Sequence, residues 1–180
     1  MSAPNGKPLL LLDVDGPLNP FAARQTLRPA GYSPHRMLPE GWLAREAARG
    51  KRARPIRVWL NPGHGPALMA LPFELVWATA WTHGANQLIA GHVGLPRLPV
   101  ITWPEMFQVD PDGVHWKTRH LVSWAAGRPF AWVDDEHTDA DRAWVAANHA
   151  GPALLHYVDP GIGLADDDFA ALKVWAEGQR

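Results

Sequence analysis

Two aspartates at the end of an apolar run are the residues of this chain best suited to chemistry. Asp13 and Asp15 follow four consecutive leucines, and Gly16 and Pro17 come directly after them. Two carboxylates this close repel each other unless one is protonated or a cation lies between them. Mg²⁺ suits the arrangement because it takes oxygen ligands and is often held by one or two carboxylates together with a phosphate. The pair is a candidate metal or catalytic site, although aspartate is also common where a strand ends in a polar turn.

The elements around this pair predict an α/β fold. The unbroken apolar run is typical of a strand buried on both faces, here over residues 9–14, and Gly16 and Pro17 end it. Such strands alternating with helices indicate a mainly parallel sheet with helices on both faces. A chain of 180 residues fits one domain, 1–180. Four more strands, making about five, are expected over 73–79, 99–103, 130–133 and 153–158, and helices over about 61–71, 82–92, 117–126, 139–150 and 164–178.

Polar residues follow two of these later strands. Thr79 ends the strand at 73–79, and Asp134 and Asp135 follow the strand at 130–133. In open α/β sheets ligands bind beyond the carboxyl ends of the strands, so we expect these side chains to lie near Asp13. Thr79 could instead simply cap the next helix, for which Thr82 is the expected N-cap, and the two aspartates could be a polar strand end.

The first of these motifs resembles a known family. Leucines followed by Asp13-Val14-Asp15-Gly16 resemble the first motif of the haloacid dehalogenase (HAD) superfamily of Mg²⁺-dependent phosphohydrolases, whose fold is a Rossmann-like three-layer sandwich. The resemblance implies that Asp13 is the nucleophile that takes up the phosphoryl group. It implies that Asp15 is the general acid and base and offers its backbone carbonyl to the metal. Pro17 departs from the family, where Thr or Val is more usual, and it removes a backbone N–H at that position.

The other motifs match the family in order, over roughly residues 9–159. Thr79 matches a hydroxyl that binds a phosphate oxygen. Lys117 matches a cation at the start of a helix, with Arg119 as the alternative. We expect the substrate to contact Gly16, Thr79, Trp81 and Lys117, although Trp81 could equally be a packing residue.

The acidic pair completes the metal site that the resemblance implies. Asp134 would be the second carboxylate on Mg²⁺, and Asp135 would bind the metal through water or orient Lys117. The implied ligand set is Asp13, Asp15, Asp134 and Asp135, and the implied activity is hydrolysis of a phosphomonoester through an aspartyl-phosphate.

An insert at residues 20–57 separates the first motif from the rest. It is rich in proline, with a short helix expected over 41–50 and a strand over 57–60. The family carries a flap or cap at this place, so the resemblance implies a flap or minimal cap and an open cleft. Residues 24–57 contain nine of the 17 Lys and Arg residues and two acidic residues, a net charge of about +7. The remainder, with eight basic and 16 acidic residues, is about −8.

The basic insert favours an anionic partner, either a small phosphorylated substrate or a nucleic-acid end, but a solvated face is about as plausible. The combination of DVDGPLNP, VWATAW and WVDDE is similar to a group of HAD-domain proteins of high-GC bacteria that is linked to RNA repair. The alternative function is a non-catalytic phosphate- or nucleic-acid-binding module on the same fold. Nothing in the sequence fixes the oligomeric state.

Composition narrows the remaining classes. The absence of cysteine excludes disulfides and thiolate metal sites. The nine histidines lack the spacing of a zinc site. Residues 1–7 are short and polar, and the leucine run is too short to span a bilayer, so we expect a cytoplasmic protein with no membrane partner. Residues 1–8 are expected to form a loosely attached tail.

Overall fold

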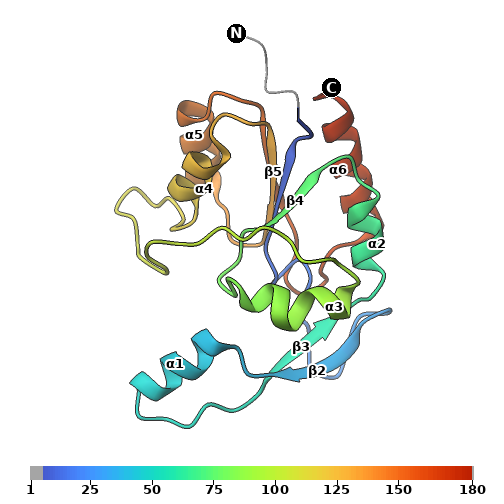
Figure 1. Cartoon of the computed structure of the whole chain (residues 1–180), viewed down its shortest axis with the longest axis vertical. Coiled ribbons are helices and arrows are strands. Elements are labelled where there is room, and N and C mark those ends of the chain that lie inside the picture. The colour runs from blue at the N-terminus through green and yellow to red at the C-terminus, as the bar shows by residue number, and fades with distance from the viewer. Residues whose placement is uncertain (1–5, 180) are drawn as a thin grey trace.

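A computed structural model describes residues 6–179 of the protein and has α/β architecture (Figure 1). Residues 1–5 of the expected N-terminal tail lie outside the described residues. The central sheet is parallel, and its strand order is β4-β1-β5-β6. Its strands are β1 (Leu9–Leu12), β4 (Glu74–Trp77), β5 (Phe130–Asp134) and β6 (Ala153–Tyr157).

The leucines of β1 explain why helices cover both faces of this sheet. Successive side chains of a strand point to opposite faces. Leu10 belongs to a core shared with Leu172, whereas Leu11 belongs to a second core shared with Leu121. The first face carries α2 (His64–Met69), α3 (Ala90–Val93) and α6 (Asp166–Glu177), and the second carries α4 (Thr118–Ala125) and α5 (Asp139–Asn148).

The strand order places a switch point at β1. The chain leaves β1 toward β4 on one side and later returns to β5 on the other side. In open sheets the crevice beyond the carboxyl ends of the strands at such a point is the usual ligand site. Asp13 and Asp15 directly follow β1 and therefore lie at this crevice.

The segment between β1 and α2 forms a small unit, called the flap below, beside that edge of the sheet (Figure 1). It consists of β2 (Ser33–Met37), α1 (Glu40–Ala48) and β3 (Ile56–Leu60), with β2 and β3 paired in antiparallel fashion. The helix and β3 agree with the expected elements, whereas β2 was not expected because of Pro34. A two-stranded ribbon leaves one edge of each strand unpaired, so a residue without an N–H is tolerated there.

Two sequence expectations were wrong. The strand expected at 99–103 is reduced to a single bridge between Val100 and Trp77, so the sheet formed by residues 6–179 has four strands and not five. Pro99 has no N–H to donate, and β4 ends at Trp77, which leaves the segment little to pair with. Thr82 does not cap a helix: its φ is 49°, and a π-helical turn, η1 (Ala85–Ile89), begins after Gly84 and runs into α3.

The helices of the described part of the chain include none that could span a bilayer.

Candidate functional site

Lys117 lies between two buried carboxylates at the carboxyl edge of the sheet. Its Nζ donates hydrogen bonds to Asp13 Oδ2 and to Asp134 Oδ2, both at 2.7 Å. Asp13 points to the same face as Leu11, and Asp134 to the same face as Trp132, because residues two apart in a strand share a face. The helix that covers this face is α4, which begins directly after Lys117. The alternation of side chains along β1 and β5, together with the position where α4 begins, thus brings the ammonium group and the two carboxylates together.

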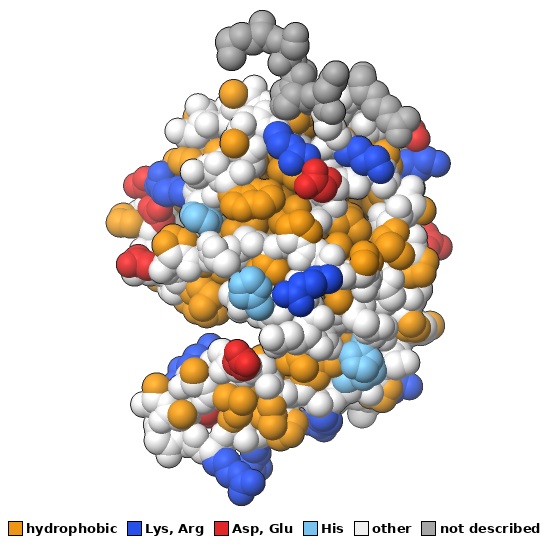
Figure 2. All heavy atoms as spheres, viewed as in Figure 1, with side chains coloured by type: hydrophobic (Ala, Val, Ile, Leu, Met, Phe, Trp, Pro, Cys, Tyr) orange, Lys and Arg blue, Asp and Glu red, His pale blue; other side chains and the backbone are white. Residues whose placement is uncertain are grey.

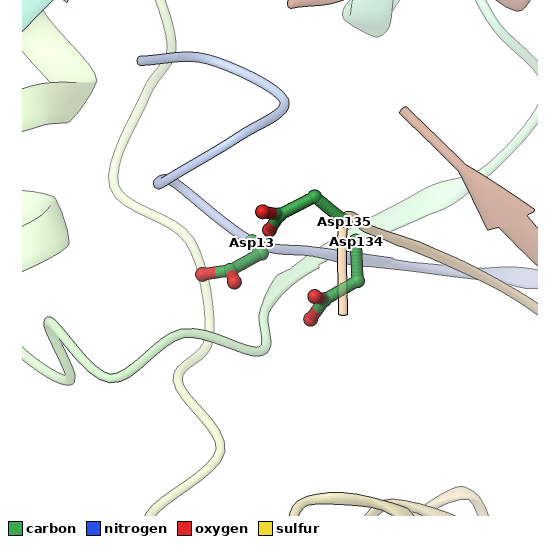
Figure 3. Close-up of side chains that lie close together, drawn as sticks. All are labelled: Asp13, Asp134 and Asp135. Carbon is green, nitrogen blue, oxygen red and sulfur yellow. The ribbon is translucent and has the colours of Figure 1, made fainter. Parts of the chain in front are cut away.

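Asp135 completes a cluster of three carboxylates. Oxygen atoms of Asp13, Asp134 and Asp135 lie within 4.8 Å of one another, and the three carboxylates extend to the same side (Figure 3). Gly16 allows this approach: a Cβ atom there would lie 2.6 Å from the Asp135 carboxyl carbon, and the φ of Gly16 is 90°. Only glycine combines this conformation with so small a volume.

The electrostatics of the cluster favour a cation. Burial would lower the pKa of Lys117, but the charges of Asp13 and Asp134 outweigh it, and the pKa is raised. The same ammonium opposes the effect of burial on Asp134 and lowers its pKa. Burial raises the pKa of Asp13 well above its usual range despite Lys117. Burial, with the charges of Asp134 and Glu136, raises the pKa of Asp135 to about 7. One ammonium therefore does not neutralise the cluster.

The two aspartates after β5 have different partners. Asp134 is fully buried, and both of its oxygens accept hydrogen bonds from the protein: Oδ2 from Lys117 and from the indole of Trp132, and Oδ1 from the Glu136 amide. Asp135 is half-buried, and no hydrogen bond joins its carboxylate to Lys117 among the described contacts. Asp134 rather than Asp135 therefore orients Lys117, contrary to one of the two roles expected for Asp135.

The structure brings Lys117, and not Arg119, to the cluster. Arg119 is exposed on α4 and pairs with Asp110 at 2.7 Å and with Asp112 at 2.9 Å in the preceding loop. The alternative cation is thus engaged elsewhere.

Asp15 lies at the junction of the sheet, the flap and the loop after β4. Its Oδ1 accepts from Asn19 Nδ2 at 2.7 Å, and its Oδ2 accepts from Trp81 Nε1 at 2.8 Å. Asn19 also accepts from the amide of Trp59 in β3 at 3.0 Å, so one side chain links the flap to Asp15. Burial raises the pKa of Asp15, although both hydrogen bonds oppose this effect. A carboxyl group with a raised pKa is suited to donating a proton.

Thr79 is fully buried in the turn after β4. Its Oγ1 accepts from the amide of Trp81 at 3.2 Å, and its carbonyl accepts from Trp103 Nε1 at 2.9 Å. Among the described residues no hydrogen bond joins Thr79 to the acidic cluster, and none accepts its hydroxyl proton, which is therefore free to be donated. Thr79 shapes the turn that presents Trp81 to Asp15.

Asp141 was a candidate helix cap or metal ligand from its place in the sequence, and the structure buries it at the start of α5, outside the acidic cluster. Its Oδ1 accepts from the His115 amide and from Thr118 Oγ1, both at 2.7 Å. Its Oδ2 accepts from the amide of Thr138 at 2.7 Å and from its hydroxyl at 3.0 Å. One carboxylate thus joins the segment around Lys117 to the start of α5. Its place in the capping box Thr138–Asp141 was visible in the sequence, but its contacts with α4 depend on tertiary packing.

Asn19 and Trp132 are the site residues that the sequence analysis missed. The sequence signal for Trp132 was its position two residues before Asp134 in the same strand, which places both side chains on one face. Asn19 carried no signal beyond its closeness to Asp15.

The donor set of the cluster fits Mg²⁺. Three carboxylates converge, no other described residue donates a hydrogen bond to the Asp135 carboxylate, and Asp15 adds a fourth carboxylate nearby. Oxygen ligands with excess negative charge are what a hard divalent cation requires.

Comparisons of the chain with family models, with curated proteins and with solved structures gave no match. The interpretation of the site therefore rests on its geometry and on the motif resemblance.

Proposed function

We propose that this protein is a Mg²⁺-dependent phosphomonoesterase that works through an aspartyl-phosphate on Asp13. The observation that carries the proposal is the pairing of Lys117 with Asp13 and Asp134, 2.7 Å from each, beside a third carboxylate at the switch point of a parallel sheet. Phosphoryl transfer needs positioning and neutralisation of charge more than covalent chemistry from the protein. A buried ammonium and a cluster of metal-binding oxygens supply both. The HAD-like motifs support the same reaction class.

Asp13 and Asp135 would hold the metal directly, and the backbone carbonyl of Asp15 would complete the protein ligands. Asp134 was expected as the second carboxylate on the metal, but both of its oxygens already accept hydrogen bonds from the protein. Asp134 keeps Lys117 in place and adds negative charge to the site. When bound, Mg²⁺ supplies charge neutralisation to the phosphate and lowers the pKa of Asp13, which keeps that carboxylate ionised.

The side chains of the chain then divide the work of two steps. A carboxylate oxygen of Asp13 attacks phosphorus, and the bond from phosphorus to the leaving oxygen breaks. Asp15, with its raised pKa, protonates that oxygen and afterwards takes a proton from the attacking water. The water oxygen forms the new bond to phosphorus, and the bond to Asp13 breaks to release inorganic phosphate. Lys117 and the free hydroxyl proton of Thr79 are the donors for phosphate oxygens.

Hydrolysis of an aryl phosphate tests this proposal. We expect turnover by the wild type that requires Mg²⁺ and is lost in Asp13→Asn. The matched control is Asp112→Asn, which changes an exposed aspartate of the loop before α4 and should leave turnover intact. Retained turnover in Asp13→Asn would contradict the proposal. A folded wild type that neither binds Mg²⁺ nor hydrolyses phosphate esters would favour the non-catalytic binding module instead.

A further inference from the structure

A cleft of about 370 Å³ opens between the flap and the body of the molecule (Figure 2). Trp42 and Arg45 of α1 line it from the flap, and Trp81 and Phe107 line it from the body. Asp15 lines it as well. The volume is within the range of small-molecule sites, and the cleft reaches the residue proposed as the general acid. Its occupant therefore lies next to the leaving oxygen.

The aromatic walls of this cleft are fixed by hydrogen bonds. Trp81 is only 8% exposed, and its Nε1 donates to Asp15 at 2.8 Å. Trp42 Nε1 donates to the carbonyl of Arg54 at 3.0 Å, which ties α1 to the segment before β3. Rigid aromatic side chains are platforms on which planar rings stack. The walls therefore suit a flat aromatic group such as a nucleobase.

The backbone around the cleft is held in an uncommon conformation. Thr82 and Phe107 both line the cleft, and both have positive φ, 49° and 62° respectively. Positive φ is a genuine outlier for a β-branched residue such as threonine. Backbone strain of this kind gathers at ligand sites, where the surrounding structure maintains it.

The flap adds positive charge beyond the cleft. Five exposed cations of the flap matter here: one lines the cleft, and four follow it in the sequence, on or after α1. Among the described contacts, only Arg49 of these five forms an ion pair, with Glu46 at 3.3 Å. The phosphate of a free mononucleotide would occupy the site around Asp13 and leave these cations unused. A strand has further phosphates to place on them. The set is Arg45, Arg49, Lys51, Arg52 and Arg54.

We infer that the cleft holds the terminal nucleoside of a single-stranded polynucleotide. The nucleobase stacks between Trp42 and Trp81, the terminal phosphate lies at Asp13, and the following phosphates lie along the cationic flap. The inference rests on the proposed function, because it places the terminal phosphate at that site. Water supplies the oxygen for the reaction, and the products are inorganic phosphate and a strand with a free terminal hydroxyl.

Binding to an inactive protein tests the inference without turnover. In the Asp13→Asn background, fluorescence anisotropy measures the Kd of a terminally phosphorylated single strand of about ten nucleotides, labelled at its other end. Trp42→Leu removes the ring, whereas Trp42→Phe keeps a ring and loses the same indole hydrogen bond to Arg54. We expect Trp42→Leu to weaken binding about fivefold or more. Trp42→Phe should retain most of the affinity, which separates stacking from the anchoring of the flap.

The salt dependence of the same Kd tests the contribution of the flap cations. Arg45→Gln should lower the slope of log Kd against log salt by about 0.7, the value for one phosphate contact on a single strand. Lys173→Gln is the matched control, because Lys173 is an exposed cation of α6, outside the flap. It should leave the slope unchanged.

Three outcomes would overturn the inference: equal binding by Trp42→Leu and Trp42→Phe, a slope insensitive to Arg45→Gln, or equal affinity for the free nucleoside monophosphate. If aryl phosphate is hydrolysed with Mg²⁺ while strand binding ignores the Trp42 ring, the cleft assignment fails and the phosphatase stands. If strand binding depends on the ring but no aryl phosphate is hydrolysed, the phosphatase proposal fails and the cleft remains a strand-binding site.

Discussion

At the scale of single residues, Lys117 has two roles: it forms ion pairs with two buried carboxylates, and it is the proposed donor to the phosphate. It is 2% exposed and lies 2.7 Å from both Asp13 and Asp134. Removing one partner of a buried ion pair leaves uncompensated charge, which destabilises a protein by about 3–5 kcal/mol. The stability of the fold and the chemistry of the site therefore depend on the same ammonium group.

Lys117→Met should accordingly lose about 3–5 kcal/mol of unfolding free energy at pH 8. Without the ammonium the pKa of Asp13 rises further, so the folded state takes up more protons than the unfolded state as the pH falls. The difference in unfolding free energy between the variant and the wild type should then become smaller toward pH 5. Urea denaturation at both pH values measures it, with Lys173→Met as the control on an exposed surface. A deficit that is the same at both pH values would contradict the account.

His64 predicts a second pH dependence, away from the acidic cluster. The side chain is 4% exposed and packs edge-on against Tyr32, with ring centroids 5.4 Å apart. Burial lowers its pKa from 6.5 to about 4. Because the folded state resists protonation of His64, the neutral side chain contributes its full stabilisation above pH 6.5. This stabilisation of the folded state is lost as the pH falls toward 4. Its size is on the order of 3 kcal/mol.

His64→Gln should therefore flatten the fall in unfolding free energy between pH 6.5 and 4. Denaturant titrations across this range measure the slope, and His83→Gln, at an exposed position, serves as the control. Parallel losses of stability in the variant and the wild type would contradict this role of His64.

At the scale of elements, Asp141 fixes how α4 and α5 begin. It accepts four hydrogen bonds, from His115 and Thr118 around the start of α4 and from Thr138 at the start of α5. Asp139 lies in the same first turn of α5 but is exposed, and it meets Arg142 only at 3.6 Å. The two aspartates form a natural comparison between a buried junction and a solvated helix start.

Asp141→Asn should cost about 1–3 kcal/mol of stability, because an amide nitrogen cannot accept the bonds that one oxygen now accepts. Asp139→Asn should change stability by less than about 0.5 kcal/mol. Chemical denaturation compares the two. Since Asp141 holds the segment that carries Lys117, its variant should also lower kcat on an aryl phosphate more than it raises KM. Equal effects of the two substitutions would remove Asp141 from this role.

The elements that the sequence predicted well are those with strong local patterns. The leucine run of β1 and the apolar runs of β5 and β6 gave strands where they were expected. The segment at 99–103 has the composition of a strand but pairs through one bridge, because pairing depends on where β4 ends. Of the β2–β3 ribbon, only β3 was predicted. β2 tolerates Pro34 because one edge of the strand is unpaired, and the local sequence does not reveal whether a strand has such an edge.

The part of the site that lies at the carboxyl ends of strands was predictable from the sequence. Asp13, Asp134 and Asp135 come together because parallel strands align their carboxyl ends. Which aspartate pairs with Lys117 was not predictable, since it depends on the alternation of β5 and on Trp132. The links through Asn19 and Asp141 join residues far apart in the chain, and only the packed structure reveals them.

At the scale of the whole molecule, the acidic cluster should make thermal stability depend on Mg²⁺. A cation that binds only the folded state stabilises it by about 2.7 kcal/mol at 100 times its Kd. The Tm of the wild type should rise with Mg²⁺ and fall on chelation. Asp135→Asn should be more stable than the wild type without Mg²⁺, because a repelled carboxylate with a pKa of about 7 is removed, and should not respond to the ion.

Differential scanning calorimetry measures these Tm values. Asp112→Asn changes an exposed aspartate and should behave as the wild type does. If the Tm of the wild type does not change with Mg²⁺, or if the Tm of Asp135→Asn still rises with it, the cluster does not hold the ion as proposed.

The most direct test of the central claim is to look for the phosphoryl group on Asp13. An aryl phosphate with an acidic leaving group needs no protonation, so Asp15→Asn should form the aspartyl-phosphate and then lack the base that activates water for its hydrolysis. Rapid quenching in acid followed by mass spectrometry should find the phosphoryl group on the peptide that contains Asp13, and only when Mg²⁺ is present. Turnover without any phosphorylated peptide, or a label that persists in Asp13→Asn, would contradict the claim that Asp13 is the nucleophile.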